Sequence, residues 1–390
     1  MEFTVKAKKF KKALARAMKA ADTSKPLLPE YALASVEAVK NSIRITCHDG
    51  VTVAVVGFAG SDLTVNDENG PFAISATWLA AALDKADGLE VTVSSPKEIA
   101  DGQSGRVTLT YGKTVLHAPA FNVTEPSLAM PSEDKKVSAG FEPEELKTAI
   151  ESVSWTAAKN DAQRPVISGV QIECNPESGA RPAAAATDSH VVAAYVMRKA
   201  TGKGDFKAVL PMKSAMLLQA VLEENDGTAI DAESDGAYAV FSDPGKWVVR
   251  TALLNGKYPN WRKLLESSAP GDEAPVMGRE ALLDAVRSAA LCAEEVRGVV
   301  TVDFDGESKE AEVTAVDEAQ QRESSAKLTY AGETPQAPFA TKGKWIADAL
   351  GKMNCGRIVL GLEGAAIVVQ PDADEADACG ARMIRSRLKI

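Results

Sequence analysis

Three neighbouring residues, Asp188, Ser189 and His190, carry the side-chain types of a hydrolytic triad, and the chain holds only three histidines. They lie in the stretch "AATDSHVVAAY", at the end of a run of alanines. A serine nucleophile needs its histidine base within hydrogen-bonding distance, but neighbours on a strand point to opposite faces. The sequence contains neither a G-x-S-x-G elbow nor a phosphate-binding G-x-x-x-x-G-K-[ST] loop. We therefore expect no enzyme activity, and a Ser/His hydrolase stays open only as a remote alternative.

The composition is typical of a soluble globular protein. Of 390 residues, 45% are hydrophobic and 25% charged, and 44 basic against 54 acidic residues give a net charge of −10. This balance argues against coating nucleic acid over the whole surface, but it allows a local basic patch. Five scattered cysteines, the absence of any bilayer-length apolar run and a charged N-terminal stretch favour a cytoplasmic protein with no membrane association. We expect no cofactor and no metal.

One unit is repeated three times along the chain. In each third, a strand-like run ends at an aspartate, and a helix-like stretch ends at a glycine 39 residues later. These pairs are Asp49 and Gly88, Asp188 and Gly227, and Asp317 and Gly356. We expect each glycine to adopt the left-handed conformation that ends a helix. A further amphipathic stretch opens each unit, and its members align in steps of 136 residues at Leu14, Ile150 and Val286.

Each unit combines two helices with strands that alternate apolar and polar residues. This pattern predicts an α+β fold in which the two helices pack on β-sheet. Polar, proline-containing stretches at 130–136 and 266–275 are expected linkers. We therefore predict three domains of one fold, at residues 1–130, 137–265 and 274–390.

The first helix concentrates positive charge. Residues 6–19 hold seven basic residues and no acid. At 100° per residue, five of them fall within about 100° of arc: Lys8, Lys9, Lys12, Arg16 and Lys19. A solvated surface and a membrane-surface helix are the alternatives. In an acidic protein, this concentration favours a local surface that faces phosphates.

The layout and several motifs resemble the bacterial DNA polymerase III β subunit, the sliding clamp family. The resemblance rests on the threefold repeat, "FTVKAKKFKKAL", "ATDSHVVAAYVM", "LLNGKYPNWRKLL", "EEVRGV" and a terminal Arg-Leu pair. It implies a DNA-clamp fold in which two chains join head to tail and six similar domains encircle duplex DNA. It also implies a processivity factor without chemistry of its own. Its partners would be duplex DNA without sequence specificity, polymerase and repair proteins, the clamp loader and a second copy.

The resemblance assigns residues to the DNA side and to the ring interface. Lys25, on the loop "SKPLLPEY", matches a basic position that contacts DNA in the family. The DNA-facing set is then Lys8, Lys9, Lys12, Arg16 and Lys25, and binding without a loader is expected to be weak and salt-sensitive. Ring closure would use Ala290 and Leu291 against Val115. These small side chains bury little area, at about 25 cal/mol per Å², so we expect a ring that opens readily.

The resemblance further implies an apolar pocket between the second and third domains, in which clamp-binding peptides dock. Its residues, carried over position by position, are Ile167, Thr187, Ser189, His190, Val191, Val192, Pro259, Lys263, Leu264, Val296, Met383 and Ile384. Ser189 replaces a usual glycine, Val191 a usual arginine and Val296 a usual phenylalanine, and the tail "MIRSRLKI" extends past the Arg-Leu pair. Peptide preference is therefore expected to differ, and plain strand or turn packing stays an alternative at each position. A divergent clamp that serves one polymerase, or that sequesters clamp-binding proteins, is the second function left open.

Overall fold

The computed structural model describes residues 1–100, 102–123, 126, 128–223, 225, 227–271, 273–293, 298–363, 366–375 and 381–386. The chain divides into two compact units. Unit 1 comprises Met1–Lys147, Cys174–Ser178 and Ala200–Leu254, and unit 2 comprises Thr148–Glu173, Gly179–Lys199 and Asn255–Ile390. Within the described part of the chain, no helix has the length and apolar character needed to cross a membrane.

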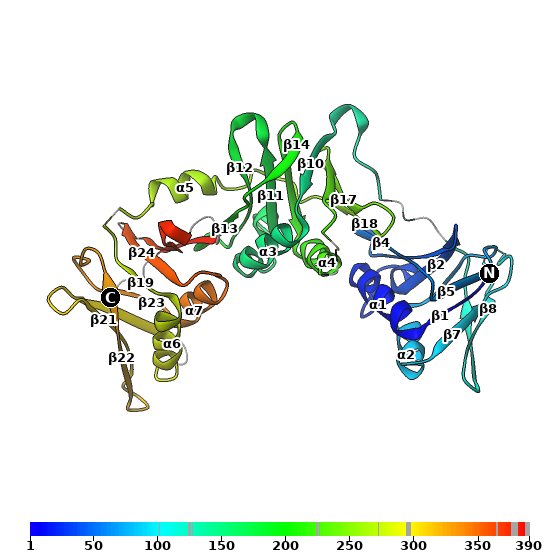
Figure 1. Cartoon of the computed structure of the whole chain (residues 1–390), viewed down its shortest axis with the longest axis horizontal. Helices are drawn as coiled ribbons and strands as arrows, with labels where there is room; N and C mark the ends of the chain where they lie inside the picture. Colours follow the sequence, from blue (N-terminus) through cyan, green and yellow to red (C-terminus); the bar gives the residue numbers. More distant parts are fainter. Residues whose placement is uncertain are drawn as a thin grey trace. The chain divides into compact units, whose positions relative to one another are not determined.

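Unit 1 contains two antiparallel sheets, with strand orders β5-β1-β7-β8-β9 and β14-β10-β16-β17-β18-β4-β3-β2-β6 (Figure 1). The strands of the first are β1 (Glu2–Lys6), β5 (Leu63–Asp67), β7 (Glu90–Ser94), β8 (Gly105–Tyr111) and β9 (Thr114–Ala120). Those of the second are β2 (Leu33–Val39), β3 (Ser42–His48), β4 (Thr52–Ala59), β6 (Phe72–Ser75), β10 (Val137–Phe141), β14 (Ala200–Lys203), β16 (Ile230–Ser234), β17 (Tyr238–Asp243) and β18 (Trp247–Ala252). Strand β15 (Phe206–Pro211) also belongs to unit 1.

Unit 2 contains one long sheet, with the order β11-β12-β13-β26-β25-β24-β19-β22-β21-β20-β23. Its strands are β11 (Gly169–Asn175), β12 (Ala180–Thr187), β13 (Val191–Val196), β19 (Val276–Gly278), β20 (Val299–Asp305), β21 (Glu310–Asp317), β22 (Arg322–Ala331), β23 (Phe339–Lys342), β24 (Arg357–Glu363), β25 (Ala366–Pro371) and β26 (Ala381–Ser386). The α+β class predicted from the sequence is confirmed, because helices pack on these sheets in both units (Figure 1).

Strand pairing joins neighbouring repeats inside each unit. In unit 1, β18 of the second repeat pairs antiparallel with β4 of the first, with Thr251 opposite Thr52. In unit 2, β26 of the third repeat pairs antiparallel with β13 of the second, with Ile384 opposite Val192. Each unit is therefore centred on a junction between repeats, and the middle repeat contributes to both. The division into three domains stays a prediction.

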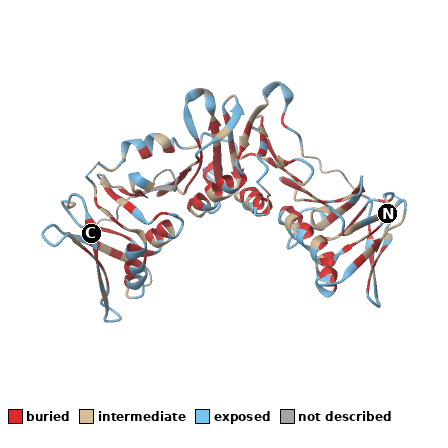
Figure 2. Ribbon diagram, viewed as in Figure 1, coloured by how far each residue is buried: buried red, intermediate tan, exposed pale blue. Residues whose placement is uncertain are grey.

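The helices predicted from the amphipathic stretches are confirmed. The α-helices are α1 (Ala7–Ala17), α2 (Ala76–Lys85), α3 (Pro143–Val153), α4 (Met212–Leu222), α5 (Trp261–Ser267), α6 (Arg279–Ala290) and α7 (Gly343–Gly351). The stretches around Leu14, Ile150 and Val286 form α1, α3 and α6. Short 3-10 turns are η1 (Met18–Ala20), η2 (Pro29–Ala32), η3 (Glu133–Lys135), η4 (Ser154–Thr156), η5 (Pro165–Ser168), η6 (Pro176–Ser178) and η7 (Ala373–Glu375). Phe10 and Leu14 of α1 are fully buried, as their spacing predicts. Figure 2 shows the buried residues concentrated where helices meet sheets.

The three glycines predicted to end helices differ in backbone conformation. Gly88 and Gly227 follow their helices with φ of +79° and +90°, in the left-handed region. The prediction was wrong for Gly356, which is not left-handed, and α7 ends earlier, at Gly351. The Gly356 N–H instead donates to the Glu375 carboxylate at 2.5 Å, so a side chain, and not a left-handed turn, satisfies this backbone group.

Candidate functional site

The Asp-Ser-His stretch forms the hairpin turn between β12 and β13. The Asp188 carboxylate accepts the N–H groups of His190 and Val191, each at 2.8 Å. The Thr187 hydroxyl accepts the Ser189 N–H at 3.0 Å and donates to the Val191 carbonyl at 2.6 Å. No hydrogen bond between Ser189 and His190 occurs in the described structure, and both side chains are exposed. Asp188 and Thr187 thus stabilise the turn through hydrogen bonds to its backbone.

The same turn occurs twice in unit 1, with glycine at its second position. Asp49 and Asp235 each accept the N–H groups two and three residues later, as Asp188 does. The residue after the aspartate has φ of +84° at Gly50 and +87° at Gly236. Ser189 has φ of +77° at this position. A Cβ in the left-handed region costs about 1–2 kcal/mol, so the central hairpin carries strain that its two relatives avoid.

We expect Ser189→Gly to raise the free energy of unfolding by up to about 1 kcal/mol, because the relief of strain exceeds the added entropy of glycine in the unfolded chain. Urea unfolding measures this. Gly50→Ser is the matched control, and it should destabilise, because its Cβ would lie 2.5 Å from the Tyr31 hydroxyl oxygen. Equal or lower stability of Ser189→Gly would show that the serine is unstrained.

Small side chains on β12 and β13 form a platform for helix α5. Ala183, Ala185 and Ala194 are buried in one cluster with Trp261 and Leu265 of α5. The two α5 residues are four apart, so they lie on the same face of the helix. The alanine run before the hairpin therefore has a packing role: its short side chains leave room for an indole and a leucine above the sheet.

Polar contacts fix α5 on this platform. The Arg262 guanidinium binds the Glu173 carboxylate at 2.5 Å and donates to the Arg181 carbonyl at 2.6 Å. The Asn260 side chain caps the helix by accepting the Lys263 N–H at 3.2 Å. The Tyr258 hydroxyl donates to the Ala185 carbonyl at 3.2 Å, and burial raises the pKa of this phenol. The segment after Pro259 therefore contains a helix that is held on the sheet by polar and apolar contacts.

Most of the predicted pocket residues lie in unit 2, in the β12–β13 hairpin, in α5, in η5 or on β26. Ile167, Thr187, Val191 and Val192 are buried, whereas Ser189, His190, Pro259, Lys263 and Leu264 are exposed. The backbones of Met383 and Ile384 lie on β26, opposite Ala193 and Val192. Val296 lies outside the described residues. The exposed members thus come from the hairpin tip and α5, and the buried members lie beneath them in the strands and η5.

Sequence reasoning missed the residues that hold α5, namely Tyr258, Trp261 and Arg262. A signal was present in "NWRKLLE": an asparagine N-cap followed by apolar residues at helical spacing. What the sequence did not reveal is that the alanines of β12 and β13 make room for this helix.

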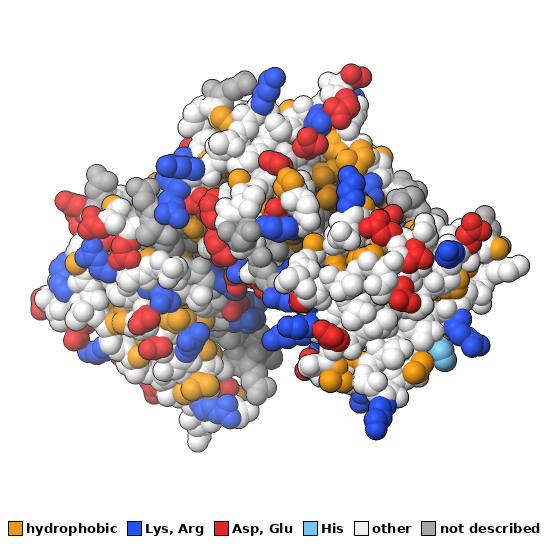
Figure 3. Space-filling view, turned by 45° about the vertical axis from the view of Figure 1, so that its right-hand side comes forward, with side chains coloured by type: hydrophobic (Ala, Val, Ile, Leu, Met, Phe, Trp, Pro, Cys, Tyr) orange, Lys and Arg blue, Asp and Glu red, His pale blue; other side chains and the backbone are white. Residues whose placement is uncertain are grey.

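The basic residues assigned to the DNA side differ in exposure. Lys8, Lys12 and Lys25 are exposed. Lys9 instead binds Asp62 at 2.5 Å and donates to the Ala59 carbonyl at 2.8 Å. Arg16 is partly buried, and burial lowers the pKa of its guanidinium. On the face that Figure 3 shows, basic side chains are interspersed with acidic ones, so any positive surface is local.

The residues assigned to the ring interface are exposed. Val115 lies on the edge strand β9 with 53% of its surface accessible. Leu291, directly after α6, is 78% exposed, and the neighbouring Ala290 is exposed as well. Single exposed apolar side chains are common on protein surfaces, so the interface assignment stays a prediction.

Comparisons with known proteins agree with this fold. The family model of the DNA polymerase III beta subunit, central domain, matches residues 141–260. The beta sliding clamp of Haemophilus influenzae is 25% identical over 311 residues, 78% of each chain. The beta subunit of Streptococcus pyogenes DNA polymerase superposes over 100% of both chains with a TM-score of 0.83 at 18% identity. A sliding clamp from Bartonella birtlesii bound to griselimycin superposes over 100% of both chains with a TM-score of 0.83 at 16% sequence identity. Residues 141–260 thus match the central domain of the DNA polymerase III beta subunit family, and the whole chain has the fold of the bacterial sliding clamps.

Proposed function

We propose that the protein is a sliding clamp, a non-enzymatic processivity factor that encircles duplex DNA in the cytoplasm and tethers polymerase and repair proteins. The observation that carries this proposal is the repeated junction between strands. The last strand of one repeat, β18 or β26, pairs with the strand after the Asp turn of the preceding repeat, β4 or β13. Two of the three such junctions in a threefold repeat are thus made within one chain.

Among the residues that the structure describes, the third junction has no partner within the chain. Strand β9 ends the first repeat and is an edge of its sheet. Strand β22, which follows the Asp317 turn, pairs with β19 only at Tyr330 and Ala331. A second copy supplies the missing partner for each, in a head-to-tail dimer with Val115 and Leu291 at the contact. Such a heterologous contact closes into a ring when the rotation per chain is a half-turn.

In this ring, the surface that faces DNA would include helix α1 and the loop that carries Lys25. Lys8, Lys12 and Lys25 are the exposed cations of the first repeat that would face phosphates. Few firm phosphate contacts suit a protein that slides, since each contact adds affinity and salt dependence. The chain is therefore expected to bind short linear duplex weakly, with an affinity that falls as salt rises.

Loading tests the proposed function directly. The protein is incubated with nicked circular DNA, ATP and the clamp loader of its source organism. We expect retention on the circle, release when the circle is linearised, and processive synthesis by the replicative polymerase. Absence of loader-dependent retention would overturn the proposal. Retention without stimulation of the replicative polymerase would instead favour a dedicated clamp paralogue.

Peptide docking is expected at the hairpin tip and the exposed side of α5. We expect Leu264→Ala and Pro259→Ala to weaken a fluorescent glutamine-leucine-type clamp-binding peptide about five- to tenfold, because each removes an apolar contact of about 1 kcal/mol or more. Anisotropy titration measures this. Met216→Ala is the matched control, since Met216 is 44% exposed against 43% for Leu264. Equal binding to all four proteins would remove the pocket assignment.

The strained Ser189 favours the second candidate function, a divergent clamp with its own partners. Its side chain is exposed at the hairpin tip, beside His190, where the family resemblance implies glycine. A hydroxyl at the docking edge adds a donor and an acceptor that glycine lacks. Comparing several clamp-binding peptides against wild type and Ser189→Gly would reveal this preference as a change in their rank order.

A further inference from the structure

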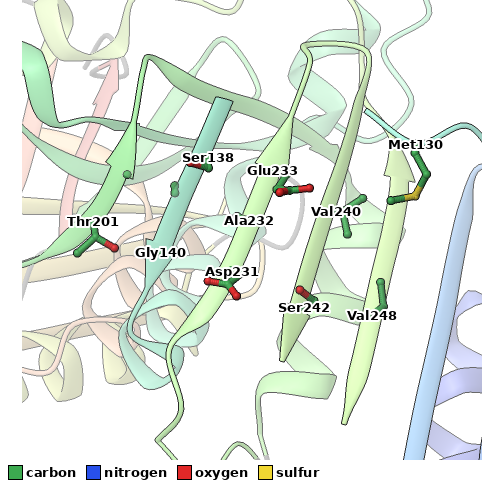
Figure 4. A pocket seen from close by; sticks show the side chains of 12 residues that line it. Met130, Ser138, Gly140, Thr201, Asp231, Ala232, Glu233, Val240, Ser242 and Val248 are labelled. Carbon is green, nitrogen blue, oxygen red and sulfur yellow. The ribbon is translucent and has the colours of Figure 1, made fainter. Parts of the chain in front are cut away.

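A groove of about 480 Å³ lies on the outer face of the second sheet of unit 1 (Figure 4). It crosses β14, β10, β16, β17 and β18, and Met130 of the linker stands at its far end. The side chains that line it alternate along the strands with Phe141, Ile230 and Phe241, which are buried on the opposite face. The groove therefore belongs to the surface that the helices do not cover.

A glycine keeps the floor of the groove open. Thr201, Gly140, Asp231, Ser242 and Val248 are successive cross-strand partners in one row of the sheet. A Cβ at Gly140 would come within 2.5 Å of the Thr201 hydroxyl oxygen, so this hydroxyl already lies over the glycine. Any larger side chain at position 140 would fill the space between Thr201 and Asp231.

The groove has an acidic part and an apolar part. Asp231 and Glu233 project from the same face of β16, two residues apart (Figure 4). The Glu233 carboxylate pairs with Lys136 at 3.2 Å, whereas Asp231 has no ion pair with any residue that the structure describes. Beside them, towards β18, the lining becomes apolar with Val240 and Val248.

Unit 2 covers the corresponding face with its own linker. The order β10-β16-β17-β18-β4-β3-β2 recurs as β19-β24-β25-β26-β13-β12-β11, so β17 corresponds to β25. On β25, Val368 is buried in the cluster with Trp261 and Leu265 of α5. Further along the linker, Pro270 lies so close to Gly361 of β24 that a Cβ there would be 2.6 Å from its ring. The linker thus fills this face in unit 2.

Unit 1 covers its groove less completely. The described linker residues 128–136 contain only the short turn η3. Met130 is 54% exposed, and Arg250 donates to the Leu128 carbonyl at 3.5 Å. Asp231 of β16 is exposed to solvent in the described structure.

We propose that this groove docks a short amphipathic segment of a partner protein, in which an arginine or lysine stands beside apolar side chains. The cation pairs with Asp231, and the apolar side chains enter between Val248 and Met130. Helix α5 shows the same chemistry within this chain, since its face carries Trp261 and its Arg262 binds a sheet carboxylate at 2.5 Å. Charge-assisted pairing of arginine with carboxylate and apolar anchoring are the usual elements of such docking. The groove is distinct from the proposed clamp-peptide pocket, and its use does not depend on that pocket.

The probe is a fluorescein-labelled synthetic peptide with the sequence of residues 257–269, KYPNWRKLLESSA, titrated against the full-length protein in anisotropy measurements. We expect saturable binding that Asp231→Asn weakens about tenfold, the usual effect of losing a charge-assisted hydrogen bond. Gly140→Val should weaken it as much by filling the floor. A peptide with glutamate in place of its arginine should not bind.

Asp87→Asn is the matched control, because it removes the same charge from an exposed site elsewhere in unit 1. It should leave the affinity unchanged, and circular dichroism checks the fold of every variant. An excess of glutamine-leucine-type clamp peptide should not displace the probe, which separates this groove from the proposed pocket. The proposal is overturned if the wild type shows no saturable binding, if Asp231→Asn and Gly140→Val both bind like wild type, or if the clamp peptide displaces the probe.

Discussion

Replacing Trp261 with alanine is expected to lower the free energy of unfolding by about 3–5 kcal/mol, the usual cost of removing a buried indole. Trp261 is only 3% exposed and packs on the alanines of β12 and β13, whose methyl groups are too short to close the cavity. Because Arg262 stacks on the indole at 4.5 Å, the change also removes a cation–π contact. Urea unfolding followed by circular dichroism measures the loss.

The same substitution should also weaken clamp-peptide binding under conditions in which the protein stays folded. Helix α5 carries Lys263 and Leu264, and without the indole it has lost its largest buried contact with the sheet. Leu264→Ala separates the two effects, since this residue is 43% exposed and should change binding with little effect on stability. Unchanged stability of Trp261→Ala would contradict the platform described for α5.

The spacing of apolar residues predicted most of the fold correctly because it reports local structure. The helices around Leu14, Ile150 and Val286 begin near the expected residues, since an amphipathic period depends only on the segment itself. The strand-like runs that end at aspartates were also predicted correctly, since β3 and β12 end one residue before Asp49 and Asp188. The predicted stop at Gly356 failed because Glu375, 19 residues away, supplies an alternative partner.

The candidate site was predictable only in part, because its geometry depends on contacts distant in sequence. The docking of α5 requires Glu173, 89 residues before Arg262, together with small residues on two other strands. Lys9 shows the same limit on the DNA side. Its place on the charged arc of α1 is correct, but Asp62, 53 residues later, binds its ammonium. Helical periodicity assigns a residue to a face and does not identify the partner that it meets there.

Replacing Leu291 with aspartate is expected to weaken the head-to-tail dimer at least a hundredfold, because an unpaired carboxylate in an apolar contact costs about 3 kcal/mol or more. Leu291 is 78% exposed in the single chain, so the substitution should leave the fold of the monomer intact. Sedimentation velocity from nanomolar to micromolar concentration measures the shift. Val115→Asp, at the opposing edge strand β9, should act in the same way.

Leu27→Asp is the matched control, since Leu27 is 85% exposed on the loop before η2 and is not among the residues assigned to the ring interface. The Leu27→Asp dimer should have the same dissociation constant as the wild-type dimer. The wild type itself should show a monomer–dimer equilibrium at low concentration, because Val115 and Ala290 offer little apolar area for ring closure. A wild-type dimer that persists at nanomolar concentration would contradict that expectation. If Leu291→Asp and Val115→Asp dissociate like the wild type, β9 and the end of α6 do not form the interface. The loading experiment would still test whether the protein forms a ring.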